Sequence, residues 1–348
     1  MNDRFQSLVS GAVLAVIIGW VLYIGKEVFV PIVFGALVVY VIVGLTRLLG
    51  RVPFIGRILP RQIHSVLSVL VIAFGLVMLV HLVLANKDSV LALAPQYQES
   101  LLAAIQKTAV FFRIEAEPTW TTLRQDLIGQ INIQSLAASM VVSVSSIAVT
   151  VIVVILYATF LLIEKRSFDA KIAAISSDPR SVARVRLVTS DINARIGTYL
   201  ALKTFICILL GATSWIVMAF MGLQFAAFWA VLIALLNYVP YIGSFLGVLL
   251  PVTMSIVQFA NPNEVLAVLL PLTVLQFLIG NFLDPYVMGN SLNLSPFAIL
   301  VSLAVWSALW GIPGAFLAVP ITAIMAIVFS EFAGTRPIAV LLSRDGRL

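Results

Sequence analysis

An acidic residue at the end of an apolar segment is the strongest chemical signal in this sequence. Asp284 follows the apolar run 265–282 and is itself followed by Pro285. A carboxylate at membrane depth is costly to bury, and intramembrane acids commonly mark ion or substrate pathways. We therefore predict that Asp284 holds a coupling proton or cation. The alternative is an acid that caps a helix end or pairs with a basic group such as Lys203.

Other polar side chains share this segment. Gln276 and Asp284 stand eight residues apart with Gly280 between them, so a regular helix places all three on one face, with Asn281 beside it. A polar face on an apolar helix predicts the wall of a cavity. Lys203 lies one turn inside another apolar stretch, where it must pair or extend to the membrane surface.

Two breaks interrupt the C-terminal apolar runs. NYVPYIG occupies residues 237–243, and LWGIPG occupies residues 309–314. Broken helices in lipid are tolerated only where the freed backbone groups face protein or a water-filled cavity. The predicted hinge or break positions are Pro240, Gly243, Pro285, Gly311, Pro313 and Gly314.

A short internal echo follows the two breaks. GSFLGVLLPVT begins at Gly243, and GAFLAVPIT begins at Gly314. Paired interrupted helices in two parts of a chain point to the binding site of a transporter. The alternative is a chance similarity between two apolar stretches.

Polar and aromatic side chains cluster at the same breaks. Amides and phenols hydrogen-bond hydroxyl-rich ligands, and indoles cover ring faces, so we predict a path for a small polar molecule. The predicted lining comprises Asn237, Tyr238, Tyr241, Trp306 and Trp310. The alternative is that these aromatic side chains lie at the membrane interface.

The composition sets the class of protein. The 348 residues are 61% apolar and only 10% charged, with a mean hydropathy of +1.11. Soluble domains carry roughly 25% charged residues. We predict an all-α polytopic integral membrane protein with about eight membrane segments, two of them re-entrant helix–break–helix hairpins. Eight ordinary spans are the alternative.

The charge distribution predicts the topology. The net charge is +6, and residues 47–64 contain four arginines and no acid. Short basic loops stay in the cytoplasm, so both termini are expected there. This explains the basic residues without a nucleic-acid partner, and the expected partners are the lipid bilayer, a small polar substrate and a coupling ion, either H⁺ or Na⁺.

The expected division of the chain has six parts. They are residues 1–85 with three spans, 86–138 as an extracytoplasmic amphipathic helical insertion, 139–163 as a fourth span, 164–201 as a cytoplasmic basic amphipathic linker, 202–331 as the transport core, and 332–348 as a cytoplasmic tail.

The sequence does not favour an enzyme. It contains no HExxH, no GxSxG and no paired intramembrane acids, and no Walker-type glycine loop suggests an ATPase. One cysteine and two distant histidines give no metal-ligand spacing. We expect no metal and no cofactor.

The same C-terminal stretches resemble a known family. NYVPYIGSFLGVLLP, GNFLDPYVMGNSLNLSP and LWGIPGAFLAVPITA are similar to signatures of the autoinducer-2 exporter (AI-2E) family, over nearly the whole chain. The tail SEFAGTRPIAVLLS resembles the branch that includes autoinducer-2 exporters. Asp284 stands where the family often has Glu, which keeps the charge and shortens its reach.

The resemblance implies a function. It points to a secondary transporter of the bacterial inner membrane, forming a homo-oligomer and exporting a small polar molecule such as the quorum-sensing signal autoinducer-2. Some members of the family are described instead as Na⁺ or Li⁺/proton antiporters, and this is the alternative function.

Overall fold

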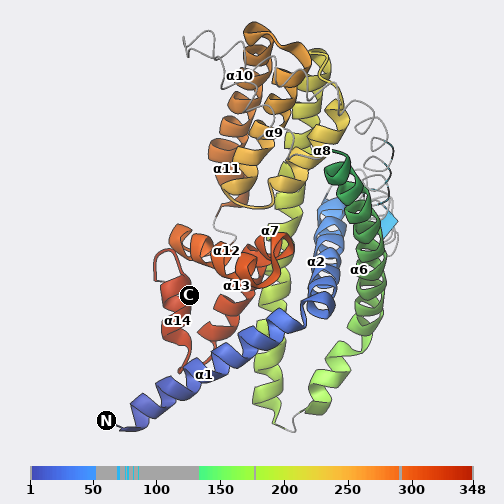
Figure 1. The fold of residues 1–348 in the computed structure, drawn as a ribbon. Helices are drawn as coiled ribbons and strands as arrows, with labels where there is room; N and C mark the ends of the chain where they lie inside the picture. The colour runs from blue at the N-terminus through green and yellow to red at the C-terminus, as the bar shows by residue number, and fades with distance from the viewer. Residues whose placement is uncertain are drawn as a thin grey trace. The chain divides into compact units, whose positions relative to one another are not determined.

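The computed structural model describes residues 2–51, 133–175, 178–289 and 292–346, with isolated helical positions at 69, 70, 75, 77, 81 and 85. Within these ranges every regular element is a helix (Figure 1). The prediction of an all-α fold is confirmed. The predicted amphipathic insertion lies almost entirely outside the described residues, as does most of the predicted third span.

The N-terminal part consists of long helices. Helix α1 covers Asn2–Ile24 and α2 covers Lys26–Arg51, with only Gly25 between them. Helices α6, Ile133–Ile175, and α7, Pro179–Phe220, have 43 and 42 residues. At about 1.5 Å per residue each exceeds 60 Å, about twice the hydrocarbon thickness of a bilayer. Their ends therefore extend beyond the apolar core of a membrane.

The start of α7 has a local polar cap. Asp178 accepts hydrogen bonds from the backbone N–H groups of Arg180 and Ser181 and from the Ser181 hydroxyl. The hydroxyl bond and the backbone bonds favour the charged carboxylate, so they lower the pKa of Asp178. Asp178 therefore satisfies backbone donors that the first helical turn leaves without partners.

The C-terminal part contains two helical hairpins. In the first, α8, Ala226–Leu236, packs on α9, Ile242–Phe259. In the second, α12, Pro296–Trp310, packs on α13, Ile312–Ser330. Helix α10, Pro262–Leu278, follows the first hairpin and packs on α9. Between the hairpins the chain also forms the π-helix η2, Ile279–Leu283, and α11, Asp284–Met288; α14, Arg336–Leu342, follows α13.

The helices have the length and composition of membrane segments. In the described part of the chain five are long and apolar enough to cross a bilayer: Lys26–Gly44, Pro179–Phe220, Ile242–Phe259, Pro262–Met288 and Ile312–Ser330. Four shorter apolar helices accompany them, including Ala226–Leu236 and Pro296–Trp310. The chain is thus a polytopic membrane protein. The number of spans and the re-entrant path of the hairpins stay predictions.

The chain divides into two compact units. The first unit comprises Met1–Val71, Ile152–Leu202 and Met288–Leu348, and the second comprises Ile72–Val151 and Lys203–Val287. The predicted transport core 202–331 therefore contributes to both units, with one hairpin in each. All boundaries of the predicted division, including those of the core, stay predictions.

The first unit has a core built around α7. Ile196, Tyr199 and Leu200 pack against Leu294, Val319 and Ala323. Small residues let α2 approach closely, because a side chain at Gly44 would meet the backbone oxygen of Gly197. Close approach through small residues is the usual way in which membrane helices associate.

Candidate functional site

A buried ion pair lies in the second unit. The Lys203 ammonium on α7 donates to Oδ2 of Asp284 over 2.8 Å. The Lys203 side chain is 7% exposed and that of Asp284 is 21% exposed. The pairing that the sequence left open as an alternative is therefore present. Solvent screens an ion pair inside an apolar unit only weakly. Its net contribution to stability therefore depends on good geometry and on further hydrogen bonds to both charged groups.

The pair has unused hydrogen-bonding capacity. Oδ1 of Asp284 is buried and has no hydrogen-bond partner among the residues that the structure describes. An ammonium has three donors, and within the same residues the Lys203 ammonium donates only to Asp284. A buried acceptor without a donor costs about 1–3 kcal/mol. The site thus offers one acceptor and two donors to a ligand.

A π turn sets the position of Asp284. The backbone N–H of Asp284 bonds to the carbonyl oxygen of Ile279, five residues earlier. Pro285 has no N–H to give to the preceding turn, and a wider turn accommodates such an interruption. Single π turns inside α-helices are frequent at functional sites.

Two predictions about this segment need correction. The helix does not break at Pro285, because α11 continues to Met288. The equal spacing of Gln276, Gly280 and Asp284 does not place them on one regular helical face, because the π turn Ile279–Leu283 inserts an extra residue.

An amide network extends the site toward the first hairpin break. Oδ1 of Asn237 accepts from Nε2 of Gln276 over 3.2 Å, and Nδ2 of Asn237 donates to Sγ of Cys207 over 3.6 Å. The Tyr238 hydroxyl bonds to the hydroxyl of Thr204 over 2.6 Å. Asn237 is buried. Three elements, α7, the hairpin break and α10, therefore meet through polar side chains.

Sequence reasoning missed two members of this network. Thr204 and Cys207 are ordinary residues in an apolar helix and carry no charge. The available signal was their spacing: Thr204 follows Lys203 directly, and Cys207 lies four residues after it, on the same side of α7.

Asn281 and Tyr241 do not join the buried cluster. Nδ2 of Asn281 donates to the backbone oxygen of Phe277 over 3.1 Å, and Asn281 is exposed. Tyr241 is 56% exposed. Its φ of 61° and ψ of −59°, with the Ile242 N–H bonded to the Pro240 oxygen over 2.7 Å, form a strained γ-turn. The first break is therefore a tight turn with an exposed tip.

Trp306 and Trp310 lie in the first unit and are buried against protein. Their position relative to the membrane interface stays a prediction. Nε1 of Trp306 donates to the hydroxyl of Thr322 over 3.3 Å, and Nε1 of Trp310 donates to the backbone oxygen of Leu22 over 2.9 Å. Their ring centroids are 5.2 Å apart. Neither indole N–H is left to bind a solute.

The glycines of the hairpins serve close packing. A Cβ on Gly243 would overlap the carbonyl oxygen of Leu236, and one on Gly314 would overlap that of Trp306. Both glycines lie within the second helix of their hairpin, as does Pro313. Their prediction as breaks is therefore wrong. The breaks are residues 237–241, with Pro240, and Gly311, which has a φ of 66°.

No set of three His, Cys, Asp or Glu side chains that could hold a metal occurs in the part of the chain that the structure describes. The ionisable groups of the second-unit site are one acid and one amine, and its other members are amides, hydroxyls and a thiol. This chemistry suits binding of protons, monovalent cations or polar solutes.

Comparison with known proteins relates this architecture to transporters. The chain is 29% identical to the AI-2 transport protein TqsA of Escherichia coli (strain K12), over 84% of this chain and 85% of TqsA. It is 28% identical to YhhT of the same strain, over 83% and 82% of the two chains. Similarity to YrrI of Bacillus subtilis (strain 168) is 31% over 42% of this chain and 41% of YrrI.

The family pattern covers both units and the whole polar site. The model that defines AI-2E family transporters matches residues 12–334, which include both hairpins and the Lys203–Asp284 pair. The chain therefore belongs to the AI-2E transporter family.

Proposed function

We propose that this transporter is a secondary active exporter of a small polar solute such as autoinducer-2, coupled to a proton or cation at Asp284. The solute class is supported by the relative TqsA, which is named for AI-2 transport. The coupling role is supported by the buried Lys203–Asp284 pair. We place the protein in the bacterial inner membrane with both termini in the cytoplasm, in keeping with its basic loops. A homo-oligomeric state stays a prediction.

The open hydrogen-bonding capacity of the ion pair carries the proposal. Asp284 Oδ1 is a buried acceptor without a partner in the described part of the chain, and Lys203 has donors to spare. A hydroxyl group donates one hydrogen bond and accepts others. A solute with adjacent hydroxyl or carbonyl groups therefore complements both members of the pair without bringing a net charge into the unit.

Coupling follows from the charge balance of the pair. Protonation of Asp284, or a cation at its free oxygen, weakens its attraction for Lys203. The bound proton or cation also occupies the acceptor oxygen that a solute hydroxyl would use, so an inward ion and an outward solute compete for the same carboxylate. Loading of the ion and loading of the solute thus act on the same pair, which is the requirement for linked transport.

The test uses cells that lack the protein or carry the intact chain, Asp284→Asn, Lys203→Met or the double variant Lys203→Met/Asp284→Leu. Internal and external autoinducer-2 are measured in each. Glu264→Gln is the matched control, because Glu264 is an exposed acid in the first turn of α10. We expect outward transport with the intact chain and with the control only.

The double variant separates a structural role from a transport role. Removing one partner of a buried ion pair costs about 3–5 kcal/mol, whereas replacing both with apolar groups is often neutral. We expect the double variant to recover the thermal stability lost in the single variants but not transport. Normal transport in the double variant would show that the pair is structural.

The cation/proton antiport alternative is tested by the same proteins. If cells with and without the intact chain have equal autoinducer-2 distributions, export of this solute is excluded. Na⁺-driven or Li⁺-driven proton movement in vesicles then becomes the decisive measurement. Antiport that depends on Asp284 would keep the coupling role and replace the solute.

A further inference from the structure

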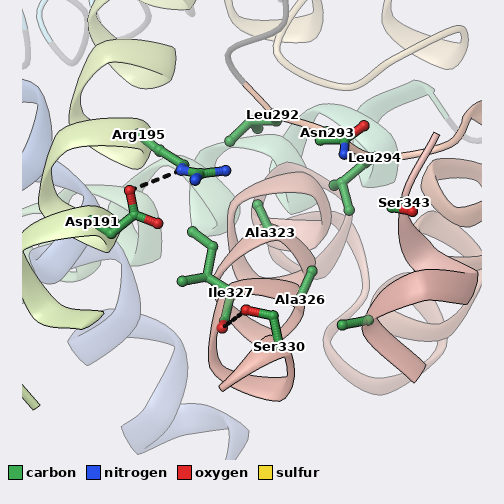
Figure 2. Close-up of a pocket in the computed structure, with 11 residues that line it drawn as sticks. Asp191, Arg195, Leu292, Asn293, Leu294, Ala323, Ala326, Ile327, Ser330 and Ser343 are labelled. Carbon is green, nitrogen blue, oxygen red and sulfur yellow. Dashed lines mark hydrogen bonds and ion pairs between the residues drawn. The ribbon is translucent and has the colours of Figure 1, made fainter. Parts of the chain in front are cut away.

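An open cavity in the first unit lies away from the residues used above. It is a pocket with about 480 Å³ of empty space, part of which is open to solvent (Figure 2). Its apolar wall comes from the loop before α12 and from α13 and α14, and includes Leu294, Ala323 and Ala339, all buried. Asp191 and Arg195 of α7 close its polar side. The proposed transport function uses none of these side chains.

Most polar groups around this cavity already have protein partners. The Asn293 side chain donates to Asp345 over 3.1 Å and accepts from the backbone N–H of Arg344 over 3.3 Å. The hydroxyl of Ser330 donates to the backbone oxygen of Ile327 over 2.7 Å. The hydroxyl of Ser343 donates to Val340 and accepts from Gly346. These groups hold the wall together and leave little for a ligand.

Asp191 and Arg195 are different. Nε of Arg195 donates to Oδ1 of Asp191 over 2.9 Å, and the two side chains are 42% and 47% exposed. Within the described ranges, the two terminal amino groups of Arg195 and Oδ2 of Asp191 have no hydrogen-bond partner. Figure 2 shows the guanidinium reaching over the cavity toward Leu292. The pair has no net charge but offers donors and an acceptor side by side.

The cavity lies close to the expected membrane surface. Ile327 and Ser330 are at the end of α13, a candidate membrane span, and α14 begins six residues after that span ends. Helix α14 and its approach expose large apolar side chains: Phe332 at 59%, Ile338 at 46% and Leu341 at 80%. Arg336 and Arg344 flank Ile338 and Leu341. A short helix with exposed apolar residues between arginines is typical of the membrane interface.

We propose that this cavity binds the phosphoethanolamine headgroup of a membrane phospholipid. The phosphodiester accepts hydrogen bonds from the terminal amino groups of Arg195, a geometry that guanidinium groups favour. The primary ammonium donates to Oδ2 of Asp191. The zwitterionic headgroup matches the zwitterionic side-chain pair, and the acyl chains follow the exposed apolar residues of α14. The proposal is independent of the transported solute.

The experiment measures lipid binding to the full-length protein, delipidated in detergent, by native mass spectrometry and thermal shift. Phosphatidylethanolamine, phosphatidylcholine and phosphatidylglycerol with identical acyl chains are compared. Phosphatidylcholine has no ammonium N–H, and phosphatidylglycerol has no ammonium group. Soluble phosphoethanolamine separates a lipid site from a site for a free headgroup. We expect phosphatidylethanolamine to bind at least about tenfold more tightly than the other two lipids. Neither of them can make the charge-assisted hydrogen bond from an ammonium N–H to Asp191.

Three variants complete the test. Arg195→Gln is expected to weaken binding of phosphatidylethanolamine about tenfold. Asp191→Asn is expected to remove the preference over phosphatidylcholine while retaining phosphodiester binding. Arg180→Gln, an exposed position on the same helix that does not line the cavity, is the matched control and should bind as the intact protein does. The Asp191–Arg195 pair is half-exposed, so its loss should change folding little.

Two outcomes would overturn the proposal. Equal binding of the three lipids to intact protein, unchanged in Arg195→Gln, would mean that the lipids coat the apolar surface without a headgroup site. Soluble phosphoethanolamine that binds as tightly as the lipid would make the cavity a site for a water-soluble zwitterion.

Discussion

The hairpins α8–α9 and α12–α13 share one close glycine–backbone contact but differ in the side chains that surround it. In each, a glycine in the first turns of the second helix touches a backbone carbonyl of the first helix: Gly243 on Leu236, and Gly314 on Trp306. Similar sequences follow the two glycines. The internal echo therefore corresponds to a shared local structure, in which two helices meet closely just after a break.

The hairpins differ in what ends the first helix. Helix α8 is followed by Asn237, whose amide bonds to side chains of α7 and α10. Helix α12 ends at Trp310, whose indole satisfies a free carbonyl at the end of α1. One hairpin thus brings polar groups to a buried ion pair, and the other is fixed by aromatic packing. Similar backbone turns do not imply equal chemistry.

The largest expected effect tests the close glycine–backbone contact that the two hairpins share. Gly243→Ala and Gly314→Ala should each destabilise the protein by about 3 kcal/mol or more, because the added methyl group meets rigid backbone atoms. Thermal unfolding in detergent measures this loss. Gly247→Ala, in the same helix as Gly243, is the control, since its Cβ would meet Ile233 only at 3.7 Å. Equal melting temperatures for Gly243→Ala and Gly247→Ala would show that the close contact at Gly243 does not stabilise the hairpin.

The next effect tests the polar end of α8. Asn237→Leu leaves the Gln276 amide without its acceptor and separates α7 from α10. We expect the transport rate to fall about tenfold. This corresponds to a loss of about 1.4 kcal/mol in the stability of the arrangement that transports solute. The measurement is solute efflux at matched protein levels. Asn237→Asp is not a suitable control, because it keeps the acceptor oxygen but adds a charge. Full transport in Asn237→Leu would reject the role of this amide.

A counterpart in the other hairpin sharpens the contrast. Thr322→Val keeps the shape of the side chain but removes the acceptor of the buried Trp306 N–H. We expect a loss of about 1–2 kcal/mol in the free energy of unfolding. Efflux by the folded fraction should match the intact protein. A transport defect larger than the folding defect would show that the second hairpin also carries chemistry.

The smallest effect concerns the turns themselves. Tyr241 has the positive φ that Gly311 adopts in the second hairpin. Tyr241→Gly should relieve backbone strain and stabilise the protein by up to about 1 kcal/mol, less the added flexibility of the unfolded chain. Tyr241→Phe keeps the strain and is the control. A loss of stability in Tyr241→Gly with no change in Tyr241→Phe would show that the aromatic ring matters more than the turn.

The sequence predicted the helical class and the two breaks, because apolar length and proline are local signals; the functional role of Asp284 stays a prediction. It also named Lys203 as a partner, since both groups are ionisable and sit in apolar surroundings. It could not predict the π turn, which depends on backbone hydrogen-bond register around Pro285. It could not predict the burial of Trp306 and Trp310, because their acceptors, Thr322 and Leu22, come from other parts of the chain.

The π turn before Asp284 has a mechanical consequence. A π turn contains one residue more than an α turn, and one residue of an α-helix corresponds to a rotation of about 100°. If the surplus residue passes from Ile279–Leu283 to the far side of Asp284, the carboxylate rotates by that angle away from Lys203. Only a few backbone hydrogen bonds exchange partners. Such a shift of the π turn along the helix Pro262–Met288 would therefore separate the two charges without unfolding the helix.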